Sequence, residues 1–408
     1  MAEVHQYRQA IDWLFSTQMF GIKLGLEGPR RLLTHALAHP AAGVRVIHVA
    51  GTNGKGSTCA MIDAVARAAG MRTGLFTSPH LIDYRERIRV CGIKIPEAAC
   101  AERLAKLREI CAGLDPHPTF FEITLALAMR WFRECECELI ILETGMGGRL
   151  DATTAVEADV CVITPVGLDH TQWLGDTLEK IAAEKAGILV PGKPCVSAPQ
   201  EPAAAGVIER EANERRCPLE FIAAPLRGYH VALAGACQRW NAALAVQALH
   251  LAGARLSPDI VRHGLGNVDW PARFERFDGG RVILDGAHNV QAAQALARTW
   301  EEAYPDEKAA LVFSAVAAKD VSGILEQLAP LAGRIFLCPV DTPRALPTDE
   351  LAACLPAGAP AHECHASFGE AFAAARATGH RVLIAGSLFL AGEARGFLVG
   401  EEYQPSAQ

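Results

Sequence analysis

Residues 44–58 read Val-Arg-Val-Ile-His-Val-Ala-Gly-Thr-Asn-Gly-Lys-Gly-Ser-Thr, and this stretch decides the fold of the first half of the chain. The apolar run Val44–Val49 predicts a buried strand, and a glycine-rich turn leads from it into a helix expected over Ser57–Ala69, with Gly70 as its left-handed cap. A glycine-rich turn between a strand and a helix is typical of a phosphate-binding loop, because its N–H groups and the helix N-terminus converge on an anion. The residues predicted to bind the nucleotide are Gly51, Thr52, Asn53, Gly54, Lys55, Gly56, Ser57 and Thr58.

The loop also predicts how a nucleotide and its metal are held. Lys55 is expected to reach the β- and γ-phosphates, and the hydroxyl of Ser57 or Thr58 to help hold Mg²⁺. A glycine separates Lys55 from Ser57, so the spacing departs from the common pattern G-x-x-x-x-G-K-[ST]. Glu143 closes a second apolar strand, 139–142, and carboxylates at such strand ends face the ligand crevice. Glu143 is therefore predicted to bind Mg²⁺.

Apolar β-branched runs alternate with helical patterns along the whole chain, which predicts α/β architecture with parallel-rich sheets. A helix is expected from about Thr177 to Ala186, with Asp176 and Glu179 as a capping box and Gly187 at its end. Turn-forming residues and a proline at 266–271 mark the best domain boundary. We predict a phosphate-loop domain over 1–268, a smaller Rossmann-like domain over 269–408, and an active site in the cleft between them. The expected strands are 44–49, 139–142, 160–164, 195–197, 282–284, 310–313, 334–337 and 381–385.

Composition narrows the function classes. The formal net charge of −7 and the lack of a Lys/Arg-rich run argue against a nucleic-acid partner. The first residues lack the features of a signal peptide, and no run of about 18 apolar residues predicts a membrane span. Thirteen cysteines, an odd number without metal or redox spacing, predict free thiols in a reducing cytoplasm. His362–His365 could be imagined as half of a metal site, but the stretch lacks a second half and is predicted to be a solvated loop.

The loop Gly-Thr-Asn-Gly-Lys-Gly-Ser resembles that of the Mur ligase superfamily, and specifically of the folylpolyglutamate and dihydrofolate synthases. Further stretches resemble characteristic segments of that family along nearly the whole chain. They are Lys23–Glu27, Thr77–Leu81 with Glu86–Ile88, Phe120–Thr124, and Asp-Gly-Ala-His-Asn from Asp285 to Asn289. The segments around Leu24, Ser78 and Phe121 are expected to line a pterin pocket. The resemblance implies an ATP-binding domain followed by a glutamate ligase domain.

The resemblance also implies individual roles. His170 follows a strand and would by itself be read as structural, but the family motif makes it a metal ligand together with Ser78. Lys185 would by itself be a partner of the helix dipole, whereas the resemblance implies a lysine carbamylated by CO₂ that completes the Mg²⁺ site. The resemblance further implies contacts with the nucleotide: Arg273 would lie at the ATP phosphates, Asp285 and His288 near the transferring phosphate, and Asn241 on the adenine side. Ala272 stands where the family usually has glycine, and a histidine common three residues before the Gln-x-x-Asn core is absent, Cys237 preceding Gln238 directly.

The implied reaction is ligation of L-glutamate to dihydropteroate or to a reduced folate, with ATP and Mg²⁺ as cofactors and an acyl phosphate as intermediate. Lys55, His170, Lys185, Arg273 and His288 would carry it, in a monomeric enzyme. A muramyl-peptide ligase would need a further domain before the loop, and only about 50 residues precede Gly51. A non-catalytic nucleotide switch would keep the loop but would have no use for Glu143 and the other predicted residues together.

Overall fold

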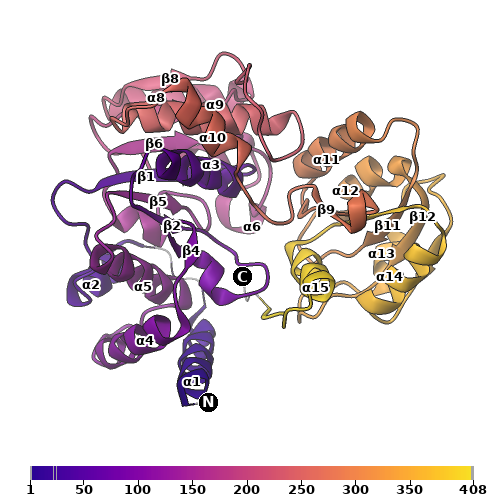
Figure 1. The fold of residues 1–408 in the computed structure, drawn as a ribbon, viewed down its shortest axis with the longest axis horizontal. Helices are drawn as coiled ribbons and strands as arrows, with labels where there is room; N and C mark the ends of the chain where they lie inside the picture. Colours follow the sequence, from indigo (N-terminus) through magenta and orange to yellow (C-terminus); the bar gives the residue numbers. More distant parts are fainter. Residues whose placement is uncertain (1, 22, 24, 406–408) are drawn as a thin grey trace.

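The computed structural model describes residues 2–21, 23 and 25–405. They form two α/β domains, each with a sheet between layers of helices (Figure 1). The sheet of the first domain has the strand order β4-β3-β2-β5-β1-β6-β7-β8. In that order the strands are β4 (Ile93–Lys94), β3 (Ile88–Val90), β2 (Thr73–Phe76), β5 (Leu139–Glu143), β1 (Arg45–Ala50), β6 (Val160–Ile163), β7 (Cys195–Ser197) and β8 (Leu219–Phe221).

The strands from β2 to β8 in this order are parallel, and β3 pairs antiparallel with both of its neighbours, β2 and β4. The carboxyl ends of β2, β5, β1 and β6 therefore meet at one edge of the sheet. This edge holds the phosphate loop and Glu143, as expected for ligand sites in parallel sheets.

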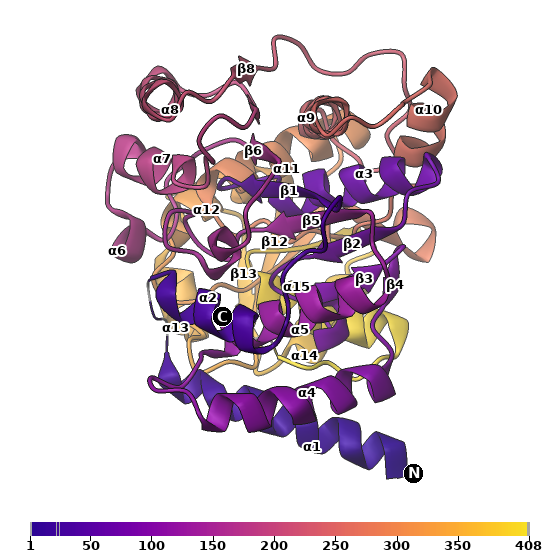
Figure 2. The same cartoon turned by 90° about the vertical axis from the view of Figure 1, so that its left-hand side faces the viewer.

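Helices cover both faces of the first sheet (Figure 2). Alternate residues of β1 point to opposite faces, Ile47 and Val49 into one core and Val46 and Ala50 into the other. The first core is covered by α3 (Lys55–Ala68), α9 (Cys237–Leu251) and α10 (Pro258–Gly266). The second is covered by α1 (Ala2–Ser16), α2 (Glu27–His35), α4 (Glu97–Ala112), α5 (Phe120–Glu134), α7 (Leu178–Ala186) and α8 (Pro202–Glu214), while the short α6 (Thr171–Leu174) precedes α7.

The second domain has a six-stranded sheet in the order β13-β12-β11-β14-β10-β9, in which only β9 runs antiparallel. Its strands are β13 (His362–Cys364), β12 (Ala332–Leu337), β11 (Ala309–Phe313), β14 (Arg381–Ala385), β10 (Val282–Leu284) and β9 (Glu275–Phe277). One face packs on α11 (Val290–Ala303), α12 (Val321–Leu328) and α13 (Thr348–Ala353), and the other on α14 (Phe368–Ala377) and α15 (Leu388–Val399). The predicted α/β class is confirmed. Residues 267–274 connect α10 to β9, and the division at 268/269 stays a prediction.

Three local predictions were wrong. The helix after the phosphate loop begins at Lys55, because Gly54 takes the left-handed φ of 87° at its N-cap. The cap of α7 is Thr177, whose hydroxyl accepts the Lys180 N–H at 3.3 Å, whereas Asp176 pairs with the Lys180 ammonium. His362–Cys364 is an edge strand, β13, paired with β12 on one side only. Its exposed residues made it look like a loop.

Two predictions concern the whole chain. All thirteen cysteines lie in the described part and are free thiols. Among the described helices, none is long and apolar enough to cross a membrane.

Candidate active site

The phosphate loop leaves β1 in a conformation that only glycine tolerates. Gly51 has a φ of 150°, and a Cβ there would lie 1.8 Å from Thr164 Oγ1. The N–H groups of Thr52 and Asn53 donate to the Pro165 carbonyl, and Thr52 Oγ1 donates to the Gly167 carbonyl at 2.9 Å. The loop is thus fixed against the segment that follows β6. Lys55 Nζ lies over the same loop, donating to the carbonyls of Gly51 (3.1 Å) and Thr52 (3.2 Å).

Glu143 ends β5 beside this loop and is 5% exposed. Its Oε2 accepts the Ser78 N–H at 3.1 Å. Burial raises the pKa of Glu143, while the charges of Lys55, Arg273 and Arg87 act in the opposite direction. Nearby hydroxyls are buried without a hydrogen-bond partner among the described residues: Thr58 Oγ1, Ser78 Oγ and Thr144 Oγ1. Oxygen donors of this kind suit a hard divalent cation.

His170 and Lys185 lie where uncharged side chains are favoured. Lys185, on α7, is 4% exposed and donates from Nζ to the Gly51 carbonyl at 2.7 Å. Burial, helped by the neighbouring charge of Lys55, lowers the pKa of Lys185 to about 7. The His170 side chain is 45% exposed, yet partial desolvation lowers the pKa of its imidazole to about 4, against the opposing effect of Asp169. A neutral imidazole is the form that binds a metal, and a neutral amine is the form that reacts with an electrophile.

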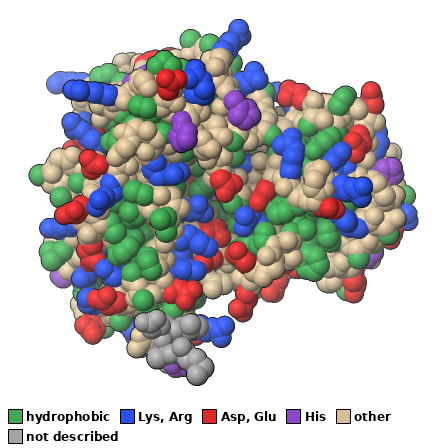
Figure 3. Space-filling view, viewed as in Figure 1, with side chains coloured by type: hydrophobic (Ala, Val, Ile, Leu, Met, Phe, Trp, Pro, Cys, Tyr) green, Lys and Arg blue, Asp and Glu red, His purple; other side chains and the backbone are tan. Residues whose placement is uncertain are grey.

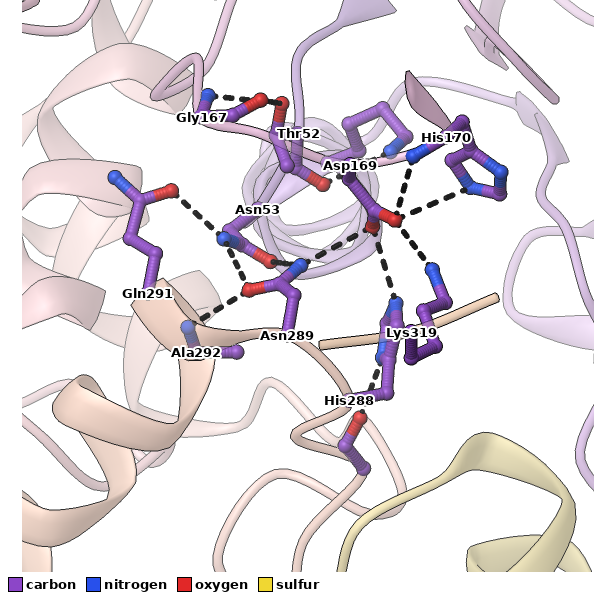
Figure 4. Close-up of polar contacts among 12 residues, drawn as sticks. Thr52, Asn53, Gly167, Asp169, His170, His288, Asn289, Gln291, Ala292 and Lys319 are labelled. Carbon is purple, nitrogen blue, oxygen red and sulfur yellow. Dashed lines mark hydrogen bonds and ion pairs between the residues drawn. The ribbon is translucent and has the colours of Figure 1, made fainter. Parts of the chain in front are cut away.

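The second domain closes over the loop through amide side chains at the start of α11 (Figure 4). Asn53 and Asn289 exchange two hydrogen bonds of 3.1 and 3.0 Å, and Asn53 Nδ2 also donates to Gln291 Oε1 at 2.8 Å. Asn289 caps α11 as well, because its Oδ1 accepts the Ala292 N–H. The phosphate loop is therefore hydrogen-bonded directly to a helix terminus of the other domain.

Asp169, in the segment after β6, is the centre of a second set of contacts between the domains (Figure 4). Its carboxylate forms an ion pair with Lys319, accepts Asn289 Nδ2 at 3.2 Å and lies 3.7 Å from His288 Nε2. Although burial acts to raise it, the nearby His288 and Lys319 hold the pKa of Asp169 well below its usual range. Asp169 is therefore an anion that joins three residues of the second domain.

The remaining predicted residues of the second domain lie at the carboxyl end of β10. Asp285 accepts the backbone N–H groups of Phe274 (2.8 Å) and Ala287 (2.9 Å), which ties the segment carrying Arg273 to the strand end. His288 Nδ1 is hydrogen-bonded to the Gly286 carbonyl at 2.8 Å, and burial lowers the pKa of His288 to about 4. Ala272, where the resembling family usually has glycine, takes a φ of 54°. This left-handed conformation explains the usual glycine.

Asn241 also lies at the phosphate loop, since a Cβ on Gly54 would come within 2.7 Å of Asn241 Oδ1. The predicted site residues that the structure describes thus lie around the phosphate loop. From the second domain, the charge of Arg273 acts to lower the pKa of Glu143. Asp169, Lys319, Gln291 and Trp270, whose Nε1 lies close to Gly56, were missed. Trp270 lies inside the predicted boundary 266–271 and Asp169 directly precedes His170, whereas no sequence signal marked Lys319. Leu24 lies outside the described residues.

Comparison with known proteins shows the family. The model of the Mur ligase middle domain matches residues 49–195, and that of the Mur ligase glutamate ligase domain matches residues 272–388. The dihydrofolate synthase/folylpolyglutamate synthase of Bacillus subtilis (strain 168) is 36% identical over 372 residues, which are 83% of this chain and 86% of the relative. The chain belongs to this family of Mur ligases.

Solved structures of the folate-synthase family agree over nearly the whole chain. E. coli FolC in complex with DHPP and ADP has a TM-score of 0.86 and 31% identity, covering 96% of this chain and 98% of its own. A bifunctional folylpolyglutamate synthase/dihydrofolate synthase of Yersinia pestis, complexed with AMPPNP and a Mn ion, has a TM-score of 0.85 and 30% identity, covering 96% and 98%. The fold, the family and the class of ATP-dependent ligase are therefore as the resemblance implied.

Proposed function

We propose that this member of the family joins the amino group of L-glutamate to the carboxylate of dihydropteroate, to the γ-carboxylate of reduced folates, or to both. One observation carries the proposal: the carboxyl ends of the strands in the two sheets lie opposite each other. The phosphate loop and Glu143 of the first domain face Arg273, Asp285 and His288 of the second. Charged side chains of both signs gather along the boundary between the two lobes (Figure 3). A phosphoryl transfer needs this kind of two-sided electrostatic site.

The reaction has two balanced steps. A carboxylate oxygen of the pterin substrate attacks the γ-phosphorus of ATP, and the bond to the β-phosphate oxygen breaks with its electron pair leaving on ADP. The neutral amino nitrogen of glutamate then attacks the acyl carbon and loses a proton, and the bond to phosphate breaks. Lys55 and Arg273 neutralise charge on the transferring group, and the contacts of Asn53 and Asp169 hold the domains closed, which keeps water from the acyl phosphate.

The residues present fit a divalent cation, for which we propose Mg²⁺. Among the described residues no three His, Cys, Asp or Glu side chains form a metal-binding group, and the other oxygen donors beside Glu143 are buried hydroxyls. Glu143, Ser78 and His170, with Ser57 or Thr58, would hold the ion, and the unpartnered hydroxyls of Ser78 and Thr58 favour this set. A bound cation would supply positive charge to the phosphate oxygens.

We also propose that Lys185 is carbamylated. The neutral amine attacks the carbon of CO₂, a C–N bond forms, and one proton is released, which leaves an anionic carbamate. Two features support this: the pKa lowered to about 7, and a buried position within hydrogen-bond distance of the phosphate loop. A carbamate there would offset the charge of Lys55 and add oxygen ligands beside the metal residues.

The pterin pocket is proposed to lie against Ser78 and Phe121, whose ring is within 2.7 Å of a Cβ built on Gly145. We infer further that the enzyme is a monomer in the cytoplasm, consistent with its thirteen free thiols. Size-exclusion chromatography with light scattering tests whether the enzyme is a monomer.

The deciding experiment measures ATP-dependent phosphate release by the purified chain with Mg²⁺ and L-glutamate. Dihydropteroate and tetrahydrofolate are supplied in separate reactions, and products are identified by mass. A gain of one glutamyl unit in both reactions establishes both activities, and a gain in one names the substrate. Phosphate release with neither pterin would redirect the proposal to another carboxylate. Nucleotide binding without turnover on any carboxylate would overturn it.

A further inference from the structure

The segment Ser78–Arg87, called here the serine loop, belongs to the first domain in sequence but is held from the second domain in space. The side chain of Leu81 packs against the core between the second sheet, α14 and α15. Its carbonyl oxygen approaches α15 so closely that a Cβ on Gly392 would lie 2.3 Å from it. Only a residue without a side chain allows this approach of helix and loop.

The chain after α15 adds a second attachment. In Figure 1 this segment returns from the second domain toward the first. Gln404 makes three hydrogen bonds to the serine loop: its N–H donates to the Ile82 carbonyl (2.8 Å), its carbonyl pairs with His80 Nε2 (3.1 Å), and its Oε1 accepts the Tyr84 N–H (3.2 Å). Tyr403 fixes the approach of this segment by packing on Gly392 and Gly396.

These contacts lead inward to the metal residues. His80 is 2% exposed and accepts Arg87 Nε at Nδ1 (2.8 Å), so its Nε2 carries the hydrogen donated to Gln404. Arg87, fully buried, is close enough for its charge to act on Glu143. At the start of the loop the Ser78 N–H donates to Glu143 directly. One end of the serine loop thus forms part of the site while its far side is fixed by the second domain.

We propose that Gln404 and Leu81 are positioning residues, through which docking of the second domain sets the serine loop in the conformation that brings Ser78 to Glu143. Binding of the metal and of the pterin then depends on Gln404, which contacts the serine loop through Ile82, His80 and Tyr84. The catalytic part of this statement rests on the proposed function, whereas the structural part does not.

The test compares two truncations of the full chain. Ending the chain after Tyr403 removes Gln404 but leaves the packing on α15, and ending it after Pro405 removes only residues 406–408 and serves as the control. Hydrogen–deuterium exchange of the peptide 78–90 should be about tenfold faster in the shorter chain, as expected for the loss of net hydrogen-bond stabilisation. Exchange of α8, which is remote from the tail, should be equal in both. Equal exchange of peptide 78–90 in the two chains would overturn the proposal, whatever the activity.

The kinetic readout separates positioning from general damage. In the shorter chain the concentration of Mn²⁺ or Mg²⁺ at half-maximal activity and the KM for the pterin should rise several-fold, with a smaller change in kcat and an unchanged KM for ATP. Gln404→Glu keeps an acceptor oxygen for the Tyr84 N–H and should behave more like the full chain than Gln404→Ala. Faster loop exchange with unchanged metal and pterin dependence would overturn the catalytic part.

A second variant guards against misfolding of the truncated chain. Gly392→Ala keeps every hydrogen-bonding group and presses a methyl group against the Leu81 carbonyl, and it should also speed exchange of peptide 78–90. Gly206→Ala, in α8 with open space around the new Cβ, is the matched control. If Gly392→Ala exchanges like Gly206→Ala, the proposal is wrong. If the full chain joins glutamate to neither pterin substrate, the proposed function is wrong. The exchange measurements still decide whether the second domain positions the serine loop.

Discussion

At the scale of single residues, the site contains ionisable side chains whose charged forms are destabilised by burial. Glu143 and Lys185 are buried and Asp285 is partly buried, and loss of water contact shifts the pKa of each toward the value that favours its neutral form. Buried groups of this kind are retained when function needs them, since an apolar side chain would cost less.

Lys55→Met should lower kcat/KM by roughly a thousandfold or more, because the transferring phosphoryl group would lose the cation of the phosphate loop. The thermal unfolding midpoint should change little, since the hydrogen bonds of Lys55 Nζ among the described residues go to two carbonyls of its own loop. Phosphate release and a melting curve measure the two effects. Lys106→Met, on the exposed surface of α4, is the control and should match the native enzyme. A loss below tenfold would contradict the assigned role.

Lys185 makes a prediction about pH. Its pKa is near 7 in the folded chain and higher when unfolded, so between these values only the unfolded chain is protonated. The free energy of unfolding should therefore rise with pH, by about 2 kcal/mol between pH 7 and pH 9 from this residue alone. The measurement is urea unfolding at pH 7 and pH 9 in CO₂-free buffer. In Lys185→Met the rise in the free energy of unfolding should be smaller than in the native protein by that amount. In Lys193→Met, which removes a half-exposed ion pair, the full rise should remain. Equal slopes in all three proteins would contradict a buried neutral lysine.

At the scale of elements, the ends of helices decide where functional side chains point. The start of α3 at Lys55 follows from Gly54, and the start of α7 follows from Thr177. Because α7 is short and carries Lys185 near its end, its cap affects the site as well as the helix.

Thr177→Ala should lower the free energy of unfolding by about 1 kcal/mol, the usual contribution of an N-cap hydroxyl. Asp176→Ala removes only an exposed ion pair with Lys180 and should cost less than about 0.5 kcal/mol. Urea unfolding curves of the two variants distinguish the cap in the structure from the capping box that the sequence suggested. The reverse order of the two losses would favour Asp176 as the cap.

At the scale of the whole molecule, closure rests on a few contacts between the domains. Lys319→Met would leave the Asp169 carboxylate buried with less compensation, and removing one partner of a buried pair is strongly destabilising. We expect a larger radius of gyration by small-angle scattering in the presence of nucleotide and a fall in kcat of about tenfold or more. Lys308→Met is the control, because this exposed lysine contacts the Pro330 carbonyl within the second domain. An unchanged scattering curve would show that this ion pair does not hold the domains.

The phosphate loop, the strand that ends at Glu143 and the α/β class could be predicted from the amino-acid sequence. Each depends on residues adjacent in the chain: a strand, a glycine turn and a helix start are encoded locally. Only the tertiary structure decided that Lys319 pairs with Asp169, 150 residues away, that Asn53 pairs with Asn289, and that Gln404 holds the serine loop. Such contacts depend on strand order and on how two sheets approach each other, which no local propensity or spacing specifies. The edge strand at His362–Cys364 escaped prediction for the same reason, because its pairing partner, β12, and not its own composition, makes it a strand.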